Sequence, residues 1–400
     1  MQRTNVVELK PNKIQKKVLK EMMLLSSSVF NMANYEVRQA FFNKDKVPSF
    51  FDLQQLIQKK DDYQLLGRSY SLPRLQIYGE TNSARFKLIK SKSQKKVGLP
   101  KYLKNRKTNT TIPSYLVIDG SQYGLKQTKA TIPLSQQLRK KYNLKQFKIK
   151  YNGILKWKGL QKRGQIHFKD KKFYLYQSVE IKEKIIKPTN NIVGIDLGIK
   201  RIFSLYSNNG LSKIFNSMRF FKQWKFYTNL ISIEQKKLSL INRKVSNNLL
   251  KLFRKRNKWQ NNLFNNLVAK LFRVLNINKI SEIFIGDIKN IRKSSSKNKL
   301  SNQMINNYWS FDKLIKKIED KSEEYGIKLN KITEEYSSRT CPMCLSNDKN
   351  NCNDRSFICC NCGYSGDRDI IGARNILSKG MYGSFKSIQR DEIIPLEVFI

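Results

Sequence analysis

The sequence is poor in several residue types, and each scarcity removes a class of function. It has one histidine, His167, which excludes catalysis by histidine pairs and metal clusters built on histidine. Any hydrolysis would therefore depend on carboxylates and metal ions. Acidic residues are also scarce: 30 Asp and Glu accompany 78 Lys and Arg, for a formal net charge of +48. The chain has no long apolar run and no lipidation signal, so a membrane-bound protein is not expected.

The positive charge is spread over all three thirds of the chain, and it indicates a polyanionic partner. Self-repulsion of this size opposes compaction unless a nucleic acid neutralises it. A surface that only keeps a protein in solution needs far less charge. Four hundred residues allow two or three domains, and 40% apolar residues are enough for real cores.

The six cysteines all lie between Cys341 and Cys362, where two Cys-x-x-Cys pairs flank a polar loop. Each pair delivers two thiolates from one tight turn, which suits tetrahedral zinc. The predicted zinc ligands are Cys341, Cys344, Cys359 and Cys362. Cys352 and Cys360 are expected to be spectators. Disulfides are disfavoured because no signal peptide opens this Lys-rich chain.

In the first half of the chain, the sequence pattern changes from helical to strand-like at about residue 98. A short strand is expected at 2–10, followed by amphipathic helical segments that begin at Pro11, near Phe51 and near Pro73. Short strands with turn residues between them then predict a small barrel or an open sheet. Two of these strands flank Lys169-Asp170-Lys171, which predicts a hairpin.

The second half alternates buried-strand patterns with helices. Buried strands are predicted to end at Asp196 and at Gly286-Asp287, and a third is predicted at 327–333. Helices are predicted at 217–245, 248–276 and 306–326, with a last helix that begins at GARNIL (372–377). A polar, mobile loop is expected at 292–302.

Carboxylates stand at the ends of these elements and on both sides of the cysteine-rich segment. Asp196 ends a strand, Glu334 and Glu335 precede the cysteines, and Asp367 and Asp369 follow them. Three carboxylates that converge from separate elements can hold two Mg²⁺ ions across a scissile phosphate. The combination with zinc knuckles in a basic chain points to nucleic-acid chemistry.

These motifs together resemble the transposon-encoded TnpB (OrfB) nucleases, the compact type V CRISPR effectors and the Fanzor proteins. The resemblance is close over about 190–378 and looser over 1–187. It implies an α/β RuvC-like, RNase H-type nuclease domain with an inserted zinc ribbon, preceded by a β-barrel wedge domain that carries a helical recognition insert. The implied boundaries are 1–10 and 95–187 for the wedge, 11–94 for the insert, 188–335 and 364–378 for the nuclease, 336–363 for the ribbon that binds target nucleic acid, and 379–400 for a tail.

The same resemblance assigns the catalytic, magnesium-binding residues, with one departure. GIDLG supplies Asp196, and DRDIIGARN supplies Asp369, with Ile371 where the family usually has Asn. The second family motif ends in Glu-Asp-Leu, whereas this chain has Gly286-Asp287-Ile288. Either the protein no longer cuts, or it belongs to the branch with a relocated glutamate, which would be Glu334. We favour relocation, with Glu335 and Asp287 as alternatives.

The resemblance implies an RNA-guided DNA endonuclease of the TnpB type that cuts by two-metal-ion hydrolysis beside a short flanking motif. The expected partners are a guide RNA and double-stranded target DNA, and the expected cofactors are structural Zn²⁺ and catalytic Mg²⁺. An intracellular location, in the cytoplasm or nucleoid of a prokaryote, is expected. Two alternatives stay open: a nuclease-inactive RNA-guided repressor and a compact type V CRISPR effector. A transposase that joins DNA itself is disfavoured, because no joining tyrosine or transposase histidine site is visible.

Overall fold

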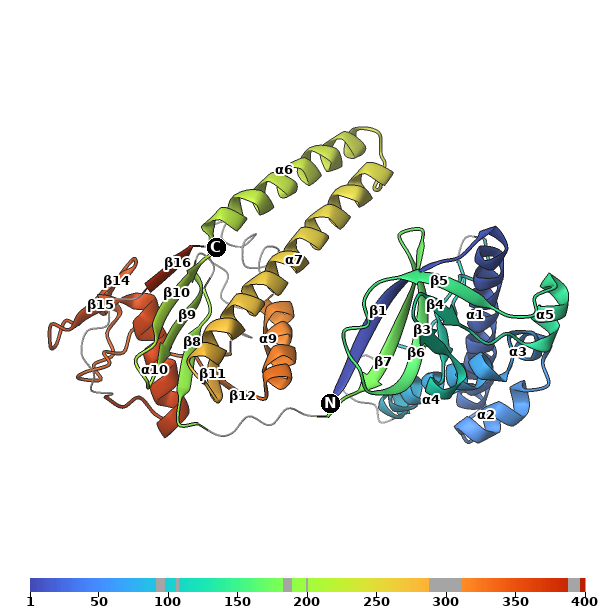
Figure 1. Ribbon diagram of the computed structural model, residues 1–400, viewed down its shortest axis with the longest axis horizontal. Coiled ribbons are helices and arrows are strands. Elements are labelled where there is room, and N and C mark those ends of the chain that lie inside the picture. The colour runs from blue at the N-terminus through green and yellow to red at the C-terminus, as the bar shows by residue number, and fades with distance from the viewer. Residues whose placement is uncertain are drawn as a thin grey trace. The chain divides into compact units, whose positions relative to one another are not determined.

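The chain folds into two compact units, Met1–Lys182 and Glu183–Ile400. The computed structural model describes residues 1–90, 98–105, 108–182, 189–198, 201–287, 311–387 and 396–399 (Figure 1). Among these residues, no helix is both long enough and apolar enough to cross a membrane. The predicted loop at 292–302 and the predicted helix start at 306–310 lie outside the described residues.

The first unit combines four helices at the start of the chain with one antiparallel sheet. The helices are α1 (Lys13–Phe42), α2 (Phe50–Ile57), α3 (Asp61–Leu66) and α4 (Arg68–Lys90), and a short α5 (Gln136–Tyr142) follows later. The strands are β1 (Gln2–Lys10), β2 (Leu116–Ile118), β3 (Gly124–Lys126), β4 (Lys129–Thr131), β5 (Lys148–Asn152), β6 (Leu160–Lys169) and β7 (Lys172–Glu180). They pair in the open order β2-β6-β7-β1-β5-β4-β3. The strand predicted at 2–10 and the helices near Pro11, Phe51 and Pro73 are confirmed.

Local sequence signals explain the ends of these elements. Asn12 and Gln15 form a capping box that starts α1. The predicted hairpin is confirmed, because Lys169 pairs with Lys172 across a two-residue turn. Asp170 and Lys171 both have positive φ angles, 53° and 64°, as a tight hairpin turn between right-twisted strands requires. One apolar core is shared by the helices and the sheet, so they fold as a unit.

The second unit is built on a mixed six-stranded sheet with the order β12-β11-β8-β9-β10-β16. Its strands are β8 (Ile192–Asp196), β9 (Arg201–Ser207), β10 (Ser212–Asn216), β11 (Glu282–Gly286), β12 (Lys328–Ile332) and β16 (Leu396–Phe399). Strands β12, β11 and β8 run parallel, β9 runs antiparallel to β8, and β10 is antiparallel to β9. The C-terminal tail, for which the sequence offered no function, adds β16 parallel to β10.

Helices cover both faces of this sheet. Residues of α7 (Asn247–Ile277) and α9 (Phe311–Tyr325) share a core with Val193 and Ile195 of β8. Residues of α10 (Arg368–Tyr382) pack on the opposite face with Phe284 of β11. Because side chains alternate along a strand, Gly194 and Asp196 face α10. A Cβ at Gly194 would lie 2.2 Å from the Ala373 carbonyl oxygen, so only glycine allows α10 to approach this closely.

Two predictions about this unit need correction. The strand at 327–333 was expected to be buried, but β12 is the edge strand of the sheet, and Lys328 and Lys331 are exposed. An edge strand has one neighbour, so its outer side stays open to solvent. The last helix begins at Arg368 and not at Gly372, because Asp367 caps it. The strands that end at Asp196 and near Gly286 are confirmed.

A long helical hairpin stands between β10 and β11 in the chain. Helices α6 (Met218–Leu240) and α7 run side by side and extend beyond the sheet (Figure 1). The carboxylate of Glu234 accepts hydrogen bonds from Ser246 and Asn248 at the start of α7, at 2.8 and 3.0 Å. Helix α7 itself contains no acidic residue. The only acidic side chain of the hairpin is therefore used to close it.

Candidate active site

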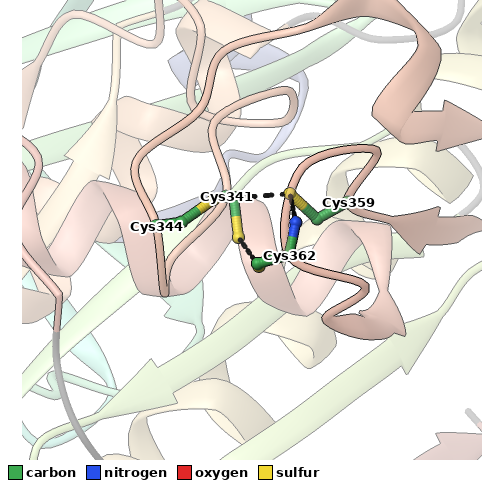
Figure 2. Close-up of side chains that lie close together, drawn as sticks. All are labelled: Cys341, Cys344, Cys359 and Cys362. Atoms are coloured by element: carbon green, nitrogen blue, oxygen red, sulfur yellow. Dashed lines mark hydrogen bonds between the residues drawn. The ribbon is translucent and has the colours of Figure 1, made fainter.

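The four predicted zinc-binding cysteines come together in a small ribbon of three strands, β13 (Cys352–Asn353), β14 (Ser356–Ile358) and β15 (Ser365–Asp367). Their sulfur atoms all lie within 4.8 Å of one another (Figure 2). The Sγ atoms of Cys341 and Cys362 are 3.6 Å apart, and those of Cys344 and Cys359 are 3.5 Å apart. A tetrahedral Zn²⁺ with four thiolates requires sulfur separations of about 3.8 Å. The donor set therefore fits zinc.

The two other cysteines lie outside this cluster. The Cys352 thiol donates a hydrogen bond to the Ser338 carbonyl oxygen at 2.8 Å. Cys360 is exposed, and its backbone N–H donates to Asn351. Neither sulfur belongs to the four-sulfur group, so both behave as the sequence predicted.

The ribbon is fastened to α10, the helix that carries Asp369. The side-chain amide of Asn375 donates to the carbonyl oxygens of Ser337 and Thr340, both at 2.7 Å. Asn375 is buried, so these hydrogen bonds satisfy an amide that water cannot reach. Strand β15 also continues directly into α10. The cysteine-rich ribbon is therefore held against this helix both at its start and at Asn375.

Asp196 ends β8 and lies against the first turns of α10. Its Oδ2 atom is 3.0 Å from the position that a Cβ on Gly372 would occupy, so the glycine leaves room for this carboxylate. Burial raises the pKa of Asp196 to about 7, and the negative charge of Asp369 adds to the rise. The guanidinium groups of Arg368 and Arg355 act in the opposite direction. Asp196 and Asp369 therefore interact electrostatically, as one site requires.

Glu334 occupies the space above Gly286. A Cβ built on Gly286 would lie 1.9 Å from Glu334 Oε1 and 2.3 Å from its Cγ. The Oε1 atom is buried and has no hydrogen-bond partner among the described residues. Burial raises the pKa of Glu334 to about 8, and the charges of Asp196 and Asp287 contribute. The acid that is missing at position 286 is thus matched in space by a carboxylate from another strand.

The fallback acids are placed differently. Glu335 is exposed, at the start of the turn that follows β12. Asp287 donates its backbone N–H to Ile332 at 2.6 Å, and its charge helps to raise the pKa of Glu334. Asp287 therefore lies beside the carboxylate cluster.

Asp367 and Asp369 have different tasks. Asp367 Oδ1 accepts hydrogen bonds from the backbone N–H groups of Asp369 and Ile370, at 3.0 and 3.3 Å, and so caps α10. Asp369 Oδ2 accepts from two guanidinium groups, those of Arg201 and Arg355. The structure thus separates a capping aspartate from one that faces the cluster.

Sequence reasoning missed both arginines. Arg201 begins β9, and Arg355 lies in the turn between β13 and β14 of the ribbon. Neither belongs to a motif, and each reaches Asp369 only through the folded chain. A basic residue is so common in this sequence that its identity alone carried no signal.

The arrangement is suited to divalent metal ions. Asp196 and Glu334 are held with raised pKa values, and the buried Oε1 atom has no protein partner among the described residues. Carboxylate oxygens are the ligands that Mg²⁺ prefers, and a bound cation would remove the cost of burying these charges. Asp196, Glu334 and Asp369 are therefore candidate Mg²⁺ ligands by their chemistry, whereas among the described residues the four cysteines alone lie close enough together to form a metal-binding group.

Comparison with known proteins gives the class of the chain. Residues 176–292 match the family described as "Probable transposase", and residues 311–376 match "Cas12f1-like, TNB domain". The chain is 29% identical to the TnpB-like protein ORF457 of Acidianus two-tailed virus, over 95% of this chain and 87% of that protein. It is 41% identical over 69 residues to the CRISPR-associated endodeoxyribonuclease Cas12f1 of Sulfoacidibacillus thermotolerans, which is 17% of this chain and 16% of that one.

A solved structure shows the same fold at low identity. The mini-RNA-guided endonuclease CRISPR-Cas_phi3 matches with a TM-score of 0.53 and 11% identity, over 99% of this chain and 94% of that chain. These findings define a protein with a Cas12/TnpB-like fold. These matches support a TnpB-type family related to the type V CRISPR effectors.

Proposed function

We propose that this protein is an RNA-guided DNA endonuclease that hydrolyses target DNA with two Mg²⁺ ions beside a short flanking motif. The observation that carries this proposal is the placement of Glu334 directly over Gly286, with a buried oxygen that has no partner in the described part of the chain. A nuclease-inactive descendant would have no reason to keep a charge that is costly to bury. The names of the Cas12f1 and CRISPR-Cas_phi3 relatives agree with this chemistry.

In keeping with the fold, we assign each part of the chain a role. In this proposal, 188–335 and 364–378 form a RuvC-like nuclease domain, and 336–363 form the zinc ribbon that contacts target nucleic acid. Residues 1–10 and 95–187 form a wedge domain around the helical recognition insert 11–94. The two halves of the nuclease domain meet where β8 packs against α10, which brings Asp196 toward Asp369.

In the proposed mechanism, the side chains of Asp196, Glu334 and Asp369 hold the divalent ions. When bound, Mg²⁺ supplies an activated water and stabilises the leaving 3′ oxygen. The protein contributes the geometry: β8 fixes Asp196, the end of β12 fixes Glu334, and the capped start of α10 fixes Asp369. Arg355 lies at the same carboxylate with its side chain 38% exposed, so it is the cation that a phosphate entering the site would meet first.

Positive charge outside the site supports a nucleic-acid partner. In the first unit, Lys150 pairs directly with Lys10 on one neighbouring strand and with Lys129 on the other. All three side chains are exposed on the same face. Like charges placed opposite one another destabilise a sheet, so this row is best explained by a polyanion that binds there.

The α6–α7 hairpin offers a second basic surface. Its cationic residues on α7 are Lys251, Arg254, Lys255, Arg256, Lys258, Lys270 and Arg273. Its one acidic residue, Glu234, is engaged within the hairpin. Lysine and arginine side chains on this surface suit a phosphate backbone. Contacts to phosphate carry no sequence information, which leaves target recognition to guide pairing.

Guided cleavage tests the proposal. The protein should be purified with its co-purifying RNA, which is sequenced and used to design a matched duplex. The parent should cut this duplex with Mg²⁺, whereas Asp196→Ala and Asp369→Ala should bind guide and target but not cut. Tight guided binding without cutting in Mg²⁺ or Mn²⁺ would favour the repressor, which the glycine at position 286 keeps as the second candidate. An RNA derived from a CRISPR array would identify a compact type V effector.

A further inference from the structure

Arg201 connects two aspartates that have different tasks. Its Nη1 atom donates to Asp367 Oδ2 and, at 3.2 Å, to Asp369 Oδ2. The three side chains are only 17%, 19% and 18% exposed, so this ion-pair network is weakly screened by solvent. Burial lowers the pKa of Arg201, but the two carboxylates outweigh it and the net shift is upward, which keeps the charge fixed.

The network ties the start of β9 to the start of α10. The other oxygen of Asp367 receives the backbone N–H groups of Asp369 and Ile370. Arg201 therefore holds the residue that caps α10 and, at the same time, the carboxylate in the first turn of that helix. One nitrogen of Arg201, Nη1, makes both contacts, and the planar guanidinium holds it in a fixed direction, whereas a lysine ammonium sits on a flexible stem.

The network also selects one oxygen of Asp369. Both Arg201 and Arg355 bind Oδ2. Among the residues that the structure describes, Oδ1 has no hydrogen-bond or ion-pair partner. The two arginines thus leave Oδ1 as the oxygen of Asp369 that is available to a metal ion, and the charge of Asp369 acts on Asp196.

The same contact has an electrostatic cost for metal binding. A fixed positive charge next to Asp369 repels a divalent cation at that carboxylate, and little solvent lies between them. Arg201 therefore orients the Asp369 carboxylate but weakens its attraction for a divalent cation.

We propose that Arg201 is a positioning residue that orients Asp369 for catalysis through the capped start of α10, at the expense of divalent-ion affinity. This inference rests on the proposed function, because it assumes that Asp369 holds a catalytic ion. It predicts a specific pattern: removal of the guanidinium should tighten ion binding and slow cleavage.

The test compares Arg201→Met and Arg201→Lys with the parent in the complex with guide RNA. Free Mn²⁺ is counted by electron paramagnetic resonance, and cleavage of a matched duplex is measured over a range of Mn²⁺ concentrations. Arg201→Met should bind Mn²⁺ roughly threefold or more tightly. At saturating Mn²⁺ it should cut at least roughly tenfold more slowly. Arg201→Lys keeps the charge, so its affinity should stay near that of the parent while its maximal rate falls.

Arg139→Met, which removes one exposed guanidinium from α5 in the first unit, controls for the loss of a charge and should change neither quantity. Weaker Mn²⁺ binding by Arg201→Met would overturn the proposal and indicate a structural role. Parental rates in both Arg201 variants would overturn it as well. If Arg201→Met does not fold, Arg201→Lys alone decides, because its maximal rate must fall at parental affinity. If the parent itself does not cut, the proposed function fails, and the Mn²⁺ affinities still test the electrostatic half of the inference.

Discussion

Replacement of Glu334 by glutamine removes one buried negative charge and keeps the size of the side chain. Burial and the charges of Asp196 and Asp287 raise the pKa of Glu334 from an ordinary 4.5 to about 8. The folded state therefore holds this proton more tightly than the unfolded state does. Below pH 4.5 both states are protonated and the group has no effect. As the pH rises from about 4.5 to about 8, the parent loses about 1.4 kcal/mol of unfolding free energy per pH unit.

The upward shift of the Glu334 pKa predicts a measurable difference in unfolding free energy. At pH 7 the ionisable Glu334 should cost the parent about 3 kcal/mol of unfolding free energy, and at pH 5 less than about 1 kcal/mol. Denaturant unfolding of the parent and of Glu334→Gln, without added Mg²⁺, measures both differences. The variant should be the more stable protein at pH 7 and should nearly match the parent at pH 5.

Cleavage by the same variant should change in the opposite direction. Loss of one of three metal-binding charges should slow guided cleavage by about 100-fold or more, while guide and target binding stay unchanged. Asp287→Asn is the matched control, and it should keep most of the activity. The reasoning would be refuted by equal stabilities at both pH values. Full cutting by Glu334→Gln together with loss of cutting in Asp287→Asn would refute it equally.

Three further predictions concern the same unit. Gly286→Ala should displace Glu334, because its Cβ would lie 1.9 Å from Oε1, and should slow guided cleavage by about 100-fold; the double variant Gly286→Glu/Glu334→Ala should recover part of that loss. Cys341→Ser should lower the zinc content measured by elemental analysis and loosen the ribbon, whereas Cys352→Ser should do neither; the reverse result would contradict the ligand set. Because the pKa of Asp196 is raised to about 7 and that of Glu334 to about 8, Mn²⁺ binding at pH 6.5 should release protons and should tighten up to about pH 8, as calorimetry in buffers of different ionisation enthalpy can show.

Much of the fold follows from local patterns in the sequence. The 2–10 strand, the first helix and the Lys169–Lys172 hairpin depend on periodicity, a capping box and a two-residue turn, all of which are local. The edge position of β12 and the addition of β16 depend on which strands pair across the sheet. Hydrophobic pattern cannot supply that order, since a short apolar run fits an edge or a central position equally well.

Some features of the candidate site could likewise be predicted from the sequence, and others could not. The family resemblance pointed to Glu334 over Glu335 and to Asp369 over Asp367, and helix capping gives Asp367 a task of its own. The contacts of Arg201 and Arg355 with Asp369 could not be foreseen. Arg201 is separated from Asp369 by 168 positions, and Arg355 reaches it from a ribbon turn whose position depends on the cysteine cluster.

This chain has an acid at position 334 and a glycine at position 286, where the family motif has the acid, and this difference indicates what the proposed site requires. Strand β11 lacks the acid, and β12 pairs with it in parallel, with Gly286 opposite Ile332. Glu334 lies two residues beyond Ile332 and so returns to the same face of the sheet. A carboxylate can therefore reach the point above Gly286 from the neighbouring strand, provided that position 286 has no side chain. In the proposed site, the glycine is what gives the relocated acid its room. The proposed chemistry needs a negative charge at one point in space, and either strand can deliver it.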